Sequence, residues 1–389
     1  MSMPPDRPDS SLSVPNSRAV AHIDLDAIEH NCALLKNLVG ERTELCAVVK
    51  ADGYGHGTVQ SAEAALAGGA TWLAVATARE AQELRGHYST QRLLVMGALN
   101  GGEELGSTLR GDADLTVWNR DFLVTVDRRA GELSTIARVH IKLDTGMGRL
   151  GTDSEGEALE LAKLVESDRL KNVELAGLMT HFATADEQGD EYFSRQLRSF
   201  QAAAEKVKAI SGNCTVHAAN SAAVLRDSAA NFDMVRCGIA IYGMDPFHTD
   251  PAVHSLKPAL ALSSYVAAIR TFVAGQSAGY GRRWRASTTT NVGILPIGYG
   301  DGVRRGLTNT GEVIVQGRRC PIVGTVSMDN IAVDLGPSSD VQPGEPAVLI
   351  GSQAGESILV EQVAGQLDTI NYEITCGLSL RVERRYHRA

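Results

Sequence analysis

The segment 44–57, "ELCAVVKADGYGHG", begins as a short apolar run, ends at Lys50, and passes at once into a turn that contains three glycines. A short run rich in apolar and β-branched residues is typical of a buried strand, and the glycines mark its end. The same pattern recurs along the chain. Eight such runs occur, at residues 44–50, 72–77, 92–97, 114–118, 138–144, 174–181, 215–220 and 234–239.

Polar segments rich in Ala, Leu and Glu separate these runs. Helices are predicted there, for example over residues 153–168 and 190–210, and over residues 26–39 after the strand-like run "AVAHIDL". Eight strands that alternate with helices over roughly 200–250 residues predict an α/β fold, a (β/α)8 barrel of the TIM type. Hydrophobic periodicity does not show whether a sheet closes into a barrel, so a doubly wound open sheet is the structural alternative.

After Met244 the pattern changes, because strand-like runs now alternate with Gly/Pro turns and helical periodicity is scarce. This change predicts a second, mostly β domain. The expected division is a flexible, polar and proline-rich N-terminal tail at residues 1–17, the barrel at residues 18–245, and the β-rich C-terminal domain at residues 246–389. The tail lacks the apolar core of a secretory signal.

The composition narrows the function classes. The 389 residues carry 46 acidic and 37 basic side chains, a formal charge of −9, which argues against nucleic-acid binding and against an anionic membrane surface. No apolar run reaches the length needed to span a bilayer. The six cysteines form no CxxC pair, so no zinc or thioredoxin-like site is expected, and the chain is predicted to be a cytoplasmic protein.

In a barrel of this kind the active site lies at the C-terminal ends of the strands. Ionisable residues gather at these ends in a number that packing does not explain: Lys50, Lys142, Arg149, His181 and Arg236. Desolvation lowers the pKa of a lysine, and a neutral amine condenses with an aldehyde or removes a proton. A salt-bridged lysine is the plainer interpretation of Lys50, but the following glycines allow close approach of a ligand.

The last two strands end in Asn220-Ser221 and Gly238-Ile239. Backbone N–H groups at such turns, with a serine hydroxyl, form a phosphate site, and this is the usual phosphate position in these barrels. Alternatively, Ser221 is a helix N-cap, a role compatible with phosphate binding. The string "GMGRLG" at residues 146–151 matches a dinucleotide-binding pattern, but the acidic residue required at the end of the next strand is missing.

Taken together, these strings resemble one family. The segments "AVVKADGYGHG", "IKLDTGMGRLG", "LMTHFA", "ANSAA", "VRCGIAIYG", "PIGYGDG", "GTVSMDN" and "INYEI" occur in the order found in alanine racemases. The resemblance spans residues 19–385. It implies a pyridoxal 5'-phosphate enzyme with a barrel and a β domain, working as a homodimer with shared active sites. Such an enzyme interconverts L-alanine and D-alanine through an external aldimine and supplies D-alanine for peptidoglycan.

The resemblance also implies roles for the reacting residues. Lys50 would hold the cofactor as an internal aldimine and then serve as one catalytic base. Tyr280, in "AGYGRRW", would be the second base, supplied across the dimer. Arg236 would contact the pyridine nitrogen, and His181 would bridge Arg236 and Tyr280 by hydrogen bonds.

The remaining residues implied by the resemblance bind the cofactor or the substrate. Those assigned to the phosphate end of the cofactor are Tyr54, Asn220, Ser221, Gly238, Ile239 and Tyr372. Those assigned to the substrate are Arg149, Met328 of the partner subunit, whose backbone N–H holds the carboxylate, and Tyr299 at the entrance. Lys142 resembles the family's carbamylated lysine, whose carbamate pairs with Arg149.

The reaction explains why two bases are needed, since racemisation takes a proton from one face of the α-carbon and returns one to the other. Arg236 is informative because most pyridoxal enzymes place a carboxylate at the ring nitrogen. An arginine only donates, so the nitrogen is unprotonated and the ring withdraws electrons less strongly. We therefore expect Arg236 to suppress transfer of the amino group to the cofactor.

Three alternatives are open. The first is a racemase with another or broader amino-acid preference, such as serine, since one methylene changes binding by only about 1–3 kcal/mol. The second is a pyridoxal-barrel decarboxylase, which would carry an acid in place of Arg236. The third is a non-enzymatic cofactor carrier, which would not need a β domain that contributes Tyr280 and Met328.

Overall fold

The computed structural model describes residues 17–388 and groups them into two compact units. One unit is Asp26–Lys257, and the other combines the residues up to Leu25 with those from Pro258 onward. Residues 1–16 of the expected N-terminal tail lie outside the described residues.

The first unit is built on a closed barrel of eight parallel strands. Each strand pairs with the next in sequence, and the last pairs with the first through Cys46 and Arg236, which closes the sheet. The strands are β2 (Glu44–Val48), β3 (Trp72–Val75), β4 (Arg92–Val95), β5 (Asp114–Val117), β6 (Ala137–Lys142), β7 (Val173–Met179), β8 (Thr215–His217) and β9 (Met234–Cys237). The predicted barrel is confirmed, and the open sheet is excluded.

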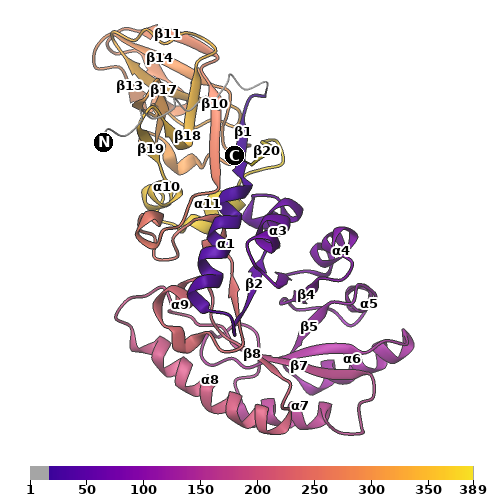
Figure 1. Ribbon diagram of the computed structural model, residues 1–389. Coiled ribbons are helices and arrows are strands. Elements are labelled where there is room, and N and C mark those ends of the chain that lie inside the picture. Colours follow the sequence, from indigo (N-terminus) through magenta and orange to yellow (C-terminus); the bar gives the residue numbers. More distant parts are fainter. Residues whose placement is uncertain (1–16, 389) are drawn as a thin grey trace, which may run out of the picture. The chain divides into compact units, whose positions relative to one another are not determined.

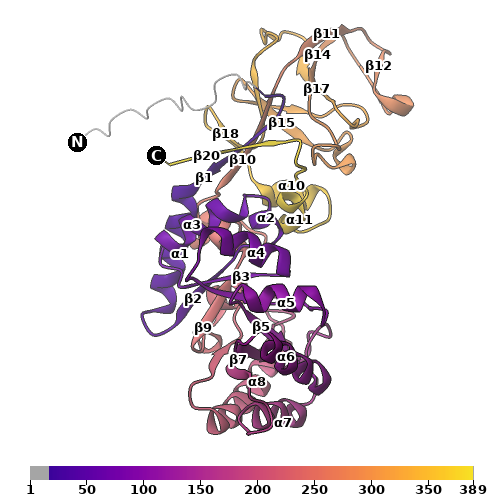
Figure 2. The same cartoon turned by 90° about the vertical axis from the view of Figure 1, so that its right-hand side faces the viewer.

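Helices alternate with the barrel strands and lie outside them (Figure 2). They are α1 (Leu25–Val39), α2 (Lys50–Tyr54), α3 (Thr58–Ala67), α4 (Ala78–His87), α5 (Glu103–Arg110), α6 (Arg120–Glu132), α7 (Glu155–Val165), α8 (Glu191–Ile210) and α9 (Ser221–Arg226), with 3-10 turns η1 (Ser228–Ala230), η2 (Ile239–Tyr242) and η3 (Pro251–His254). Side-chain oxygens of Asn119, Ser154 and Asp190 cap three of them. Among residues 17–388, none of the helices has the length and apolar character that crossing a bilayer requires.

The second unit is mostly β, as expected, and its sheets are drawn in Figure 1. The main sheet has the order β16-β15-β18-β10-β1-β20, with β19 paired to β18. Its strands are β1 (Val20–Asp24), β10 (Leu260–Tyr265), β15 (Glu312–Val315), β16 (Arg318–Pro321), β18 (Pro346–Gln353), β19 (Glu356–Ile358) and β20 (Glu383–His387). A second sheet joins β11 (Ala268–Phe272), β14 (Thr290–Leu295) and β17 (Ile331–Gly336).

Shorter elements complete this unit. They are the hairpin of β12 (Ser277–Ala278) and β13 (Trp284–Arg285), the 3-10 turns η4 (Tyr280–Arg282) and η5 (Arg305–Leu307), and the helices α10 (Val360–Gln366) and α11 (Asn371–Cys376). The turn η4, which begins at the predicted residue Tyr280, lies between the two strands of the hairpin.

The first strand within residues 17–388 lies in this second unit. β1 pairs antiparallel with β10 and parallel with β20, and Val20, Ala21 and Ile23 are fully buried. The run "AVAHIDL" is therefore a strand, but it occupies a place inside the sheet of the C-terminal unit.

Candidate active site

The chain makes an unusual turn directly after β2, at Lys50. Residues 51–55 all have positive φ, between 53° and 86°, so they form one left-handed turn. Left-handed backbone costs roughly 1–2 kcal/mol for each residue other than glycine, and here Ala51, Asp52 and Tyr54 adopt it. Strain of this kind persists where surrounding contacts hold it, and it concentrates at functional sites.

A carboxylate from the first turn of α4 fixes this turn. One oxygen of Glu80 accepts from the N–H of Ala51 at 2.7 Å, and the other accepts from Ala76 and Thr77 at 2.9 and 3.0 Å. Thr77 and Glu80 also form the capping box of α4. The N-terminus of α4 thus holds the backbone that presents Lys50, which is half-buried.

Tyr54 reaches from this turn to the end of β9. A Cβ added to Gly238 would lie 2.4 Å from the Tyr54 hydroxyl oxygen, so only glycine leaves room there. The Tyr54 ring packs against Tyr242 with a centroid distance of 5.1 Å, and the Tyr242 hydroxyl donates to the carbonyl of Val48 at 3.1 Å. The turns after β2 and β9 are therefore locked together.

Ser221 lies at the same place. Its hydroxyl oxygen accepts from the N–H groups of Gly238 at 3.1 Å and Ala240 at 3.3 Å. The cap of α9 is Asn220, whose side-chain oxygen accepts from the N–H of Ala223 at 2.9 Å. The helix-cap interpretation of Ser221 is therefore wrong, and Asn220 has that role. Four of the residues predicted for the phosphate site therefore lie close together: Tyr54, Ser221, Gly238 and the adjoining Ile239.

Arg236 is buried in β9, and its guanidinium is held on several sides. It donates to the carbonyls of Thr180 at 2.7 Å and Ala218 at 3.0 Å, and to Nδ1 of His217 at 2.8 Å. It also lies 3.4 Å from Nδ1 of His181. Burial lowers the pKa of Arg236 to about 10, so it is charged at neutral pH.

His181 therefore lies beside Arg236, as predicted. Burial, and then the charges of Arg236, Arg149, Lys142 and Lys50, lower the pKa of His181 well below its ordinary value. A neutral imidazole results. Because Arg236 only donates, Nδ1 of His181 is the acceptor and its proton is on Nε2.

The C-terminal ends of the strands thus carry a concentration of positive charge. Lys142, at the end of β6, is 5% exposed, and its pKa is lowered to about 8 by burial and by the nearby charges of Arg236 and Arg149. Such a site suits anionic groups such as phosphates and carboxylates.

Arg149 lies on a loop that Asp144 organises. The Asp144 carboxylate accepts from the N–H groups of Gly146, Met147 and Arg149 at 2.8, 2.6 and 2.9 Å. The glycine pattern at residues 146–151 falls in this loop, before α7 begins at Glu155. The pattern therefore does not open a helix, as the glycines of a dinucleotide-binding loop do, and the structure does not support the dinucleotide interpretation.

Four predicted residues belong to the C-terminal unit. Tyr280, Met328 and Tyr299 are strongly exposed for their type, at 74%, 51% and 43%. Their loops are joined by hydrogen bonds: Thr325 donates to the carbonyl of Tyr280 at 2.6 Å, and the N–H of Tyr299 donates to the carbonyl of Ser327 at 2.9 Å. The fourth, Tyr372, lies on α11 and is half-buried.

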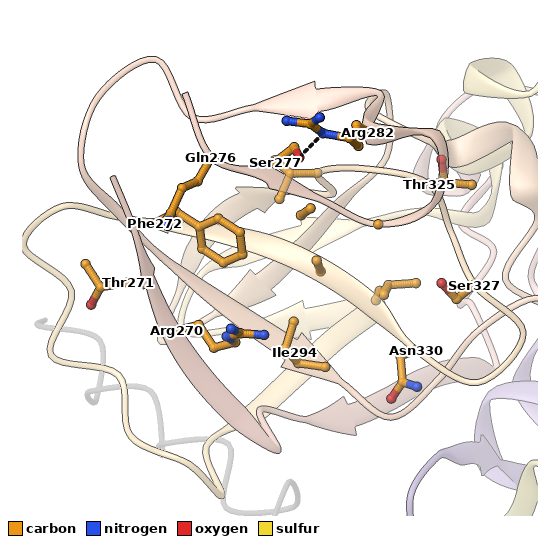
Figure 3. A pocket seen from close by; sticks show the side chains of 15 residues that line it. Arg270, Thr271, Phe272, Gln276, Ser277, Arg282, Ile294, Thr325, Ser327 and Asn330 are labelled. Atoms are coloured by element: carbon orange, nitrogen blue, oxygen red, sulfur yellow. Dashed lines mark hydrogen bonds between the residues drawn. The ribbon is translucent and has the colours of Figure 1, made fainter. Parts of the chain in front are cut away.

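A hollow of about 640 Å³ lies beside the loops of Tyr280 and Met328 (Figure 3). Ser277 and Arg282, which flank Tyr280 in sequence, line it and are joined by a hydrogen bond of 2.9 Å. Thr325 and Ser327 line the hollow from the loop that precedes Met328. This surface therefore carries exposed residues on several connected loops.

The sequence did not point to three polar residues that extend from Arg236 in a hydrogen-bonded chain: His217, His140 and Asp114. Each is fully buried and hydrogen-bonded to the next. The one available signal was that charged and imidazole side chains stand within otherwise apolar strands.

Comparison with known proteins adds the family. The family descriptions "Alanine racemase, N-terminal domain" and "Alanine racemase, C-terminal domain" match residues 23–246 and 259–386. The chain is 39% identical to the alanine racemase of Symbiobacterium thermophilum over 94% of this chain and 96% of that protein. It is 41% identical to that of Cutibacterium acnes over the same shares.

Solved structures of alanine racemases have the same fold as this chain. The alanine racemase of the D-cycloserine producer Streptomyces lavendulae superposes with a TM-score of 0.90 at 33% identity, over 96% of this chain and 98% of that one. The alanine racemase of E. faecalis gives a TM-score of 0.88 at 36% identity, over 97% and 100%.

Proposed function

The chain belongs to the alanine racemase family, a family of isomerases, and from this premise we propose that it interconverts L-alanine and D-alanine with pyridoxal 5'-phosphate bound in the barrel. The observation that carries the proposal is the junction of Lys50, Tyr54 and Gly238 described above. A broader amino-acid preference is not favoured, because the relatives named above are all alanine racemases.

The residues present fit this cofactor. Lys50 supplies the amine that joins an aldehyde, and it lies one left-handed turn before Tyr54. The Tyr54 hydroxyl fills the space where a Cβ of Gly238 would stand, and the N–H groups of Gly238 and Ala240 both donate to the Ser221 hydroxyl oxygen. Hydroxyl and N–H donors in this arrangement suit a phosphate.

When bound, the cofactor supplies an electron-withdrawing ring that lowers the barrier to loss of the substrate's α-proton. Lys50 takes or returns that proton on one face of the α-carbon. Tyr280 of the partner subunit does so on the opposite face, a role supported by its exposure. One base on each face allows the product to have the opposite configuration.

His181 and Arg236 assist the tyrosine. Nδ1 of His181 faces Arg236, so its Nε2–H is left to donate to the phenol oxygen of Tyr280. Arg236 would face the ring nitrogen as a permanent donor, which leaves that nitrogen without a proton. The expected consequence is little transfer of the amino group to the cofactor.

The substrate carboxylate would be held by Arg149 and by the backbone N–H of Met328 of the partner subunit, with Tyr299 at the entrance. A carbamate on Lys142 would turn a buried cation into an anion beside Arg149, and the lowered pKa of Lys142 favours the neutral amine that reacts with carbon dioxide. Asn220 would support the phosphate site by capping α9, and Tyr372 would add a hydroxyl to it.

The proposal includes a homodimer in the cytoplasm whose D-alanine serves peptidoglycan synthesis. Exposed Tyr280, Met328 and Tyr299, on connected loops beside a hollow, support a surface that another subunit covers. The barrel residues and these loop residues belong to different compact units of the chain.

The experiment is to follow optical rotation from L-alanine and from D-alanine with the purified chain and cofactor. Both should converge on an equal mixture, since enantiomers have equal free energy. Lys50→Ala should reduce the rate by roughly 10³-fold or more. The control is Lys163→Ala, an exposed lysine on α7 that should leave the rate unchanged.

Borohydride reduction followed by peptide mapping gives a second readout. The reduced cofactor should be found on Lys50 in the wild type and be lost in Lys50→Ala. A label on another lysine, or unchanged optical rotation, would contradict the proposal.

A further inference from the structure

A continuous chain of buried polar side chains runs through the interior of the barrel from Arg236. Arg236 donates to Nδ1 of His217 at 2.8 Å, Nε2 of His217 lies 2.8 Å from Nδ1 of His140, and Nε2 of His140 lies 3.0 Å from Oδ2 of Asp114. These residues come from β9, β8, β6 and β5. His140 on β6 and His217 on β8 are in contact although β7 lies between their strands. Such a contact requires that both side chains point into the interior of the barrel.

The direction of every hydrogen bond in this chain is fixed by its first member. An arginine has no acceptor, so Nδ1 of His217 must accept and the proton of His217 lies on Nε2. That proton is donated to Nδ1 of His140, so His140 carries its own proton on Nε2 and donates it to Asp114. Both imidazoles are therefore neutral and point the same way, from the cation toward the carboxylate.

The chain also connects a buried cation to a carboxylate. The hydrogen-bond partners of the buried Arg236 guanidinium, within residues 17–388, are main-chain carbonyls and imidazole nitrogens. An unpaired buried cation is costly. Burial alone would raise the pKa of Asp114, but the hydrogen bond from His140 and the nearby positive charges lower it to about 2. Asp114 is thus a fixed anion at the far end.

Other residues keep this anion and its partners in place. Asp114 also accepts from Arg138 at 2.6 Å and Arg92 at 2.8 Å. On β7, between the two histidines, a Cβ added to Gly177 would lie 2.1 Å from Nδ1 of His140. The absence of a side chain at Gly177 is what lets His140 reach His217.

Resting on the role proposed for Arg236, we propose that Asp114, His140 and His217 are positioning residues that hold the Arg236 guanidinium in one orientation as the charged donor to the cofactor ring. They act through Arg236 and do not touch the cofactor or the substrate. We call these three residues the relay.

The first test measures which ring nitrogens of the relay histidines carry a proton, and it does not depend on enzyme activity. In the full-length wild-type chain labelled with ¹⁵N-histidine, His217 and His140 should each show an unprotonated Nδ1 and a protonated Nε2, assigned by loss of signals in His217→Asn and His140→Leu. A protonated Nδ1 at His217 in the wild type would overturn the proposal whatever the enzyme's activity.

The second test compares two substitutions at one position. His140→Gln keeps one acceptor and one donor, whereas His140→Leu keeps only volume. By analogy with groups that act through a ligand, His140→Leu should weaken cofactor binding or lower kcat by roughly 10-fold. The Michaelis constant for alanine should stay nearly unchanged, and amino transfer to the cofactor should increase. His140→Gln should recover most of both losses.

Two further variants separate positioning from loss of stability. Gly177→Ala removes no polar group, yet it should reproduce the effects of His140→Leu because it displaces His140. Val313→Ala removes buried volume from β15, in the compact unit that does not contain the relay, and should lower thermal stability with kcat and cofactor affinity unchanged.

The outcomes separate the two proposals. Wild-type kcat, cofactor affinity and amino-transfer fraction in His140→Leu would refute the relay, as would a Gln variant no better than the Leu variant. If the wild type fails to racemise alanine, the proposed function is wrong. The ratio of cofactor affinities between His140→Gln and His140→Leu then still tests whether the relay positions Arg236.

Discussion

Lys142 is a buried amine whose charged neighbours include Arg236, Arg149 and Lys50. Burial and these cations lower its pKa to about 8 in the folded protein, against about 10.4 in an unfolded chain. Between these values the unfolded state binds the proton and the folded state does not, so stability rises with pH. The charged amine therefore opposes folding fully below pH 8, by about 3 kcal/mol, and this opposition disappears as the pH approaches 10.4.

Lys142→Met should therefore stabilise the protein most at pH 7, in buffer freed of carbon dioxide so that the amine is unmodified. The difference in free energy of unfolding from wild type should shrink between pH 8 and pH 10. Urea unfolding at several pH values measures it. The matched control is Lys163→Met, an exposed lysine whose effect should not depend on pH. A difference that stays constant with pH at position 142 would show that the amine does not titrate in this range.

Single residues differ in how visible they are in the sequence. Lys50 and Arg236 stand in distinctive strings at strand ends, so their importance was predicted from the sequence. Asp114, His140 and His217 lie within short apolar runs that read as ordinary strands. Their contacts depend on which strands face each other across the barrel, and no local pattern encodes that.

At the scale of elements, the loop between β6 and α7 is ordered by one carboxylate. Asp144 accepts three backbone N–H groups, which fixes the segment that presents Arg149. Burial alone would raise the pKa of Asp144, but these backbone hydrogen bonds lower it, so the carboxylate is charged at neutral pH. The charged carboxylate therefore holds the loop segment that carries Arg149 in one conformation.

Asp144→Ala should release this loop and raise the Michaelis constant for alanine, because Arg149 would no longer be held in place. Hydrogen bonds to a charged group contribute about 1.5–3 kcal/mol each, so a rise of roughly 10-fold or more is expected. Asp144→Asn, which keeps an acceptor oxygen, should show a smaller change.

Steady-state kinetics measures the effect of both variants. Asp153→Ala, an exposed carboxylate in the same loop, is the control and should behave as wild type. If Asp144→Ala leaves the Michaelis constant unchanged, Asp144 does not position Arg149.

The elements were largely predictable, and their backbone detail was not. The predicted helices over residues 26–39 and 190–210 correspond to α1 and α8 within one residue at each end. By contrast, the glycines predicted a turn after Lys50, but nothing in the sequence predicted the left-handed conformation of Ala51 and Tyr54, because such residues disfavour positive φ. Contacts from Glu80 and Tyr242 hold that turn, and they come from elsewhere in the chain.

At the scale of the whole molecule, the proposed dimer makes a sharp prediction. Lys50→Ala and Tyr280→Phe chains should each be nearly inactive. If each active site combines Lys50 of one chain with Tyr280 of the other, a mixed dimer contains one intact site. Random mixing at equal concentrations should then restore about a quarter of wild-type activity.

Mixing the two inactive chains after dissociation and reassociation, followed by a racemisation assay, tests this prediction. The control is the double variant with both substitutions in one chain, mixed with wild type, which forms no new intact site beyond those that wild-type pairs contain. No recovery on mixing the single variants would show that each site is built from one chain.

The sequence by itself determined the alternation of strands and helices, the change to β structure after Met244, and the strand-end residues that carry the chemistry. These follow from hydrophobic periodicity and short motifs, which are local properties of the chain. The tertiary structure alone decided that the sheet closes, that β1 joins β10 and β20, and that Asp114 connects to Arg236 through two histidines. These depend on contacts between residues far apart in sequence, which form only when strands pair and interior faces meet.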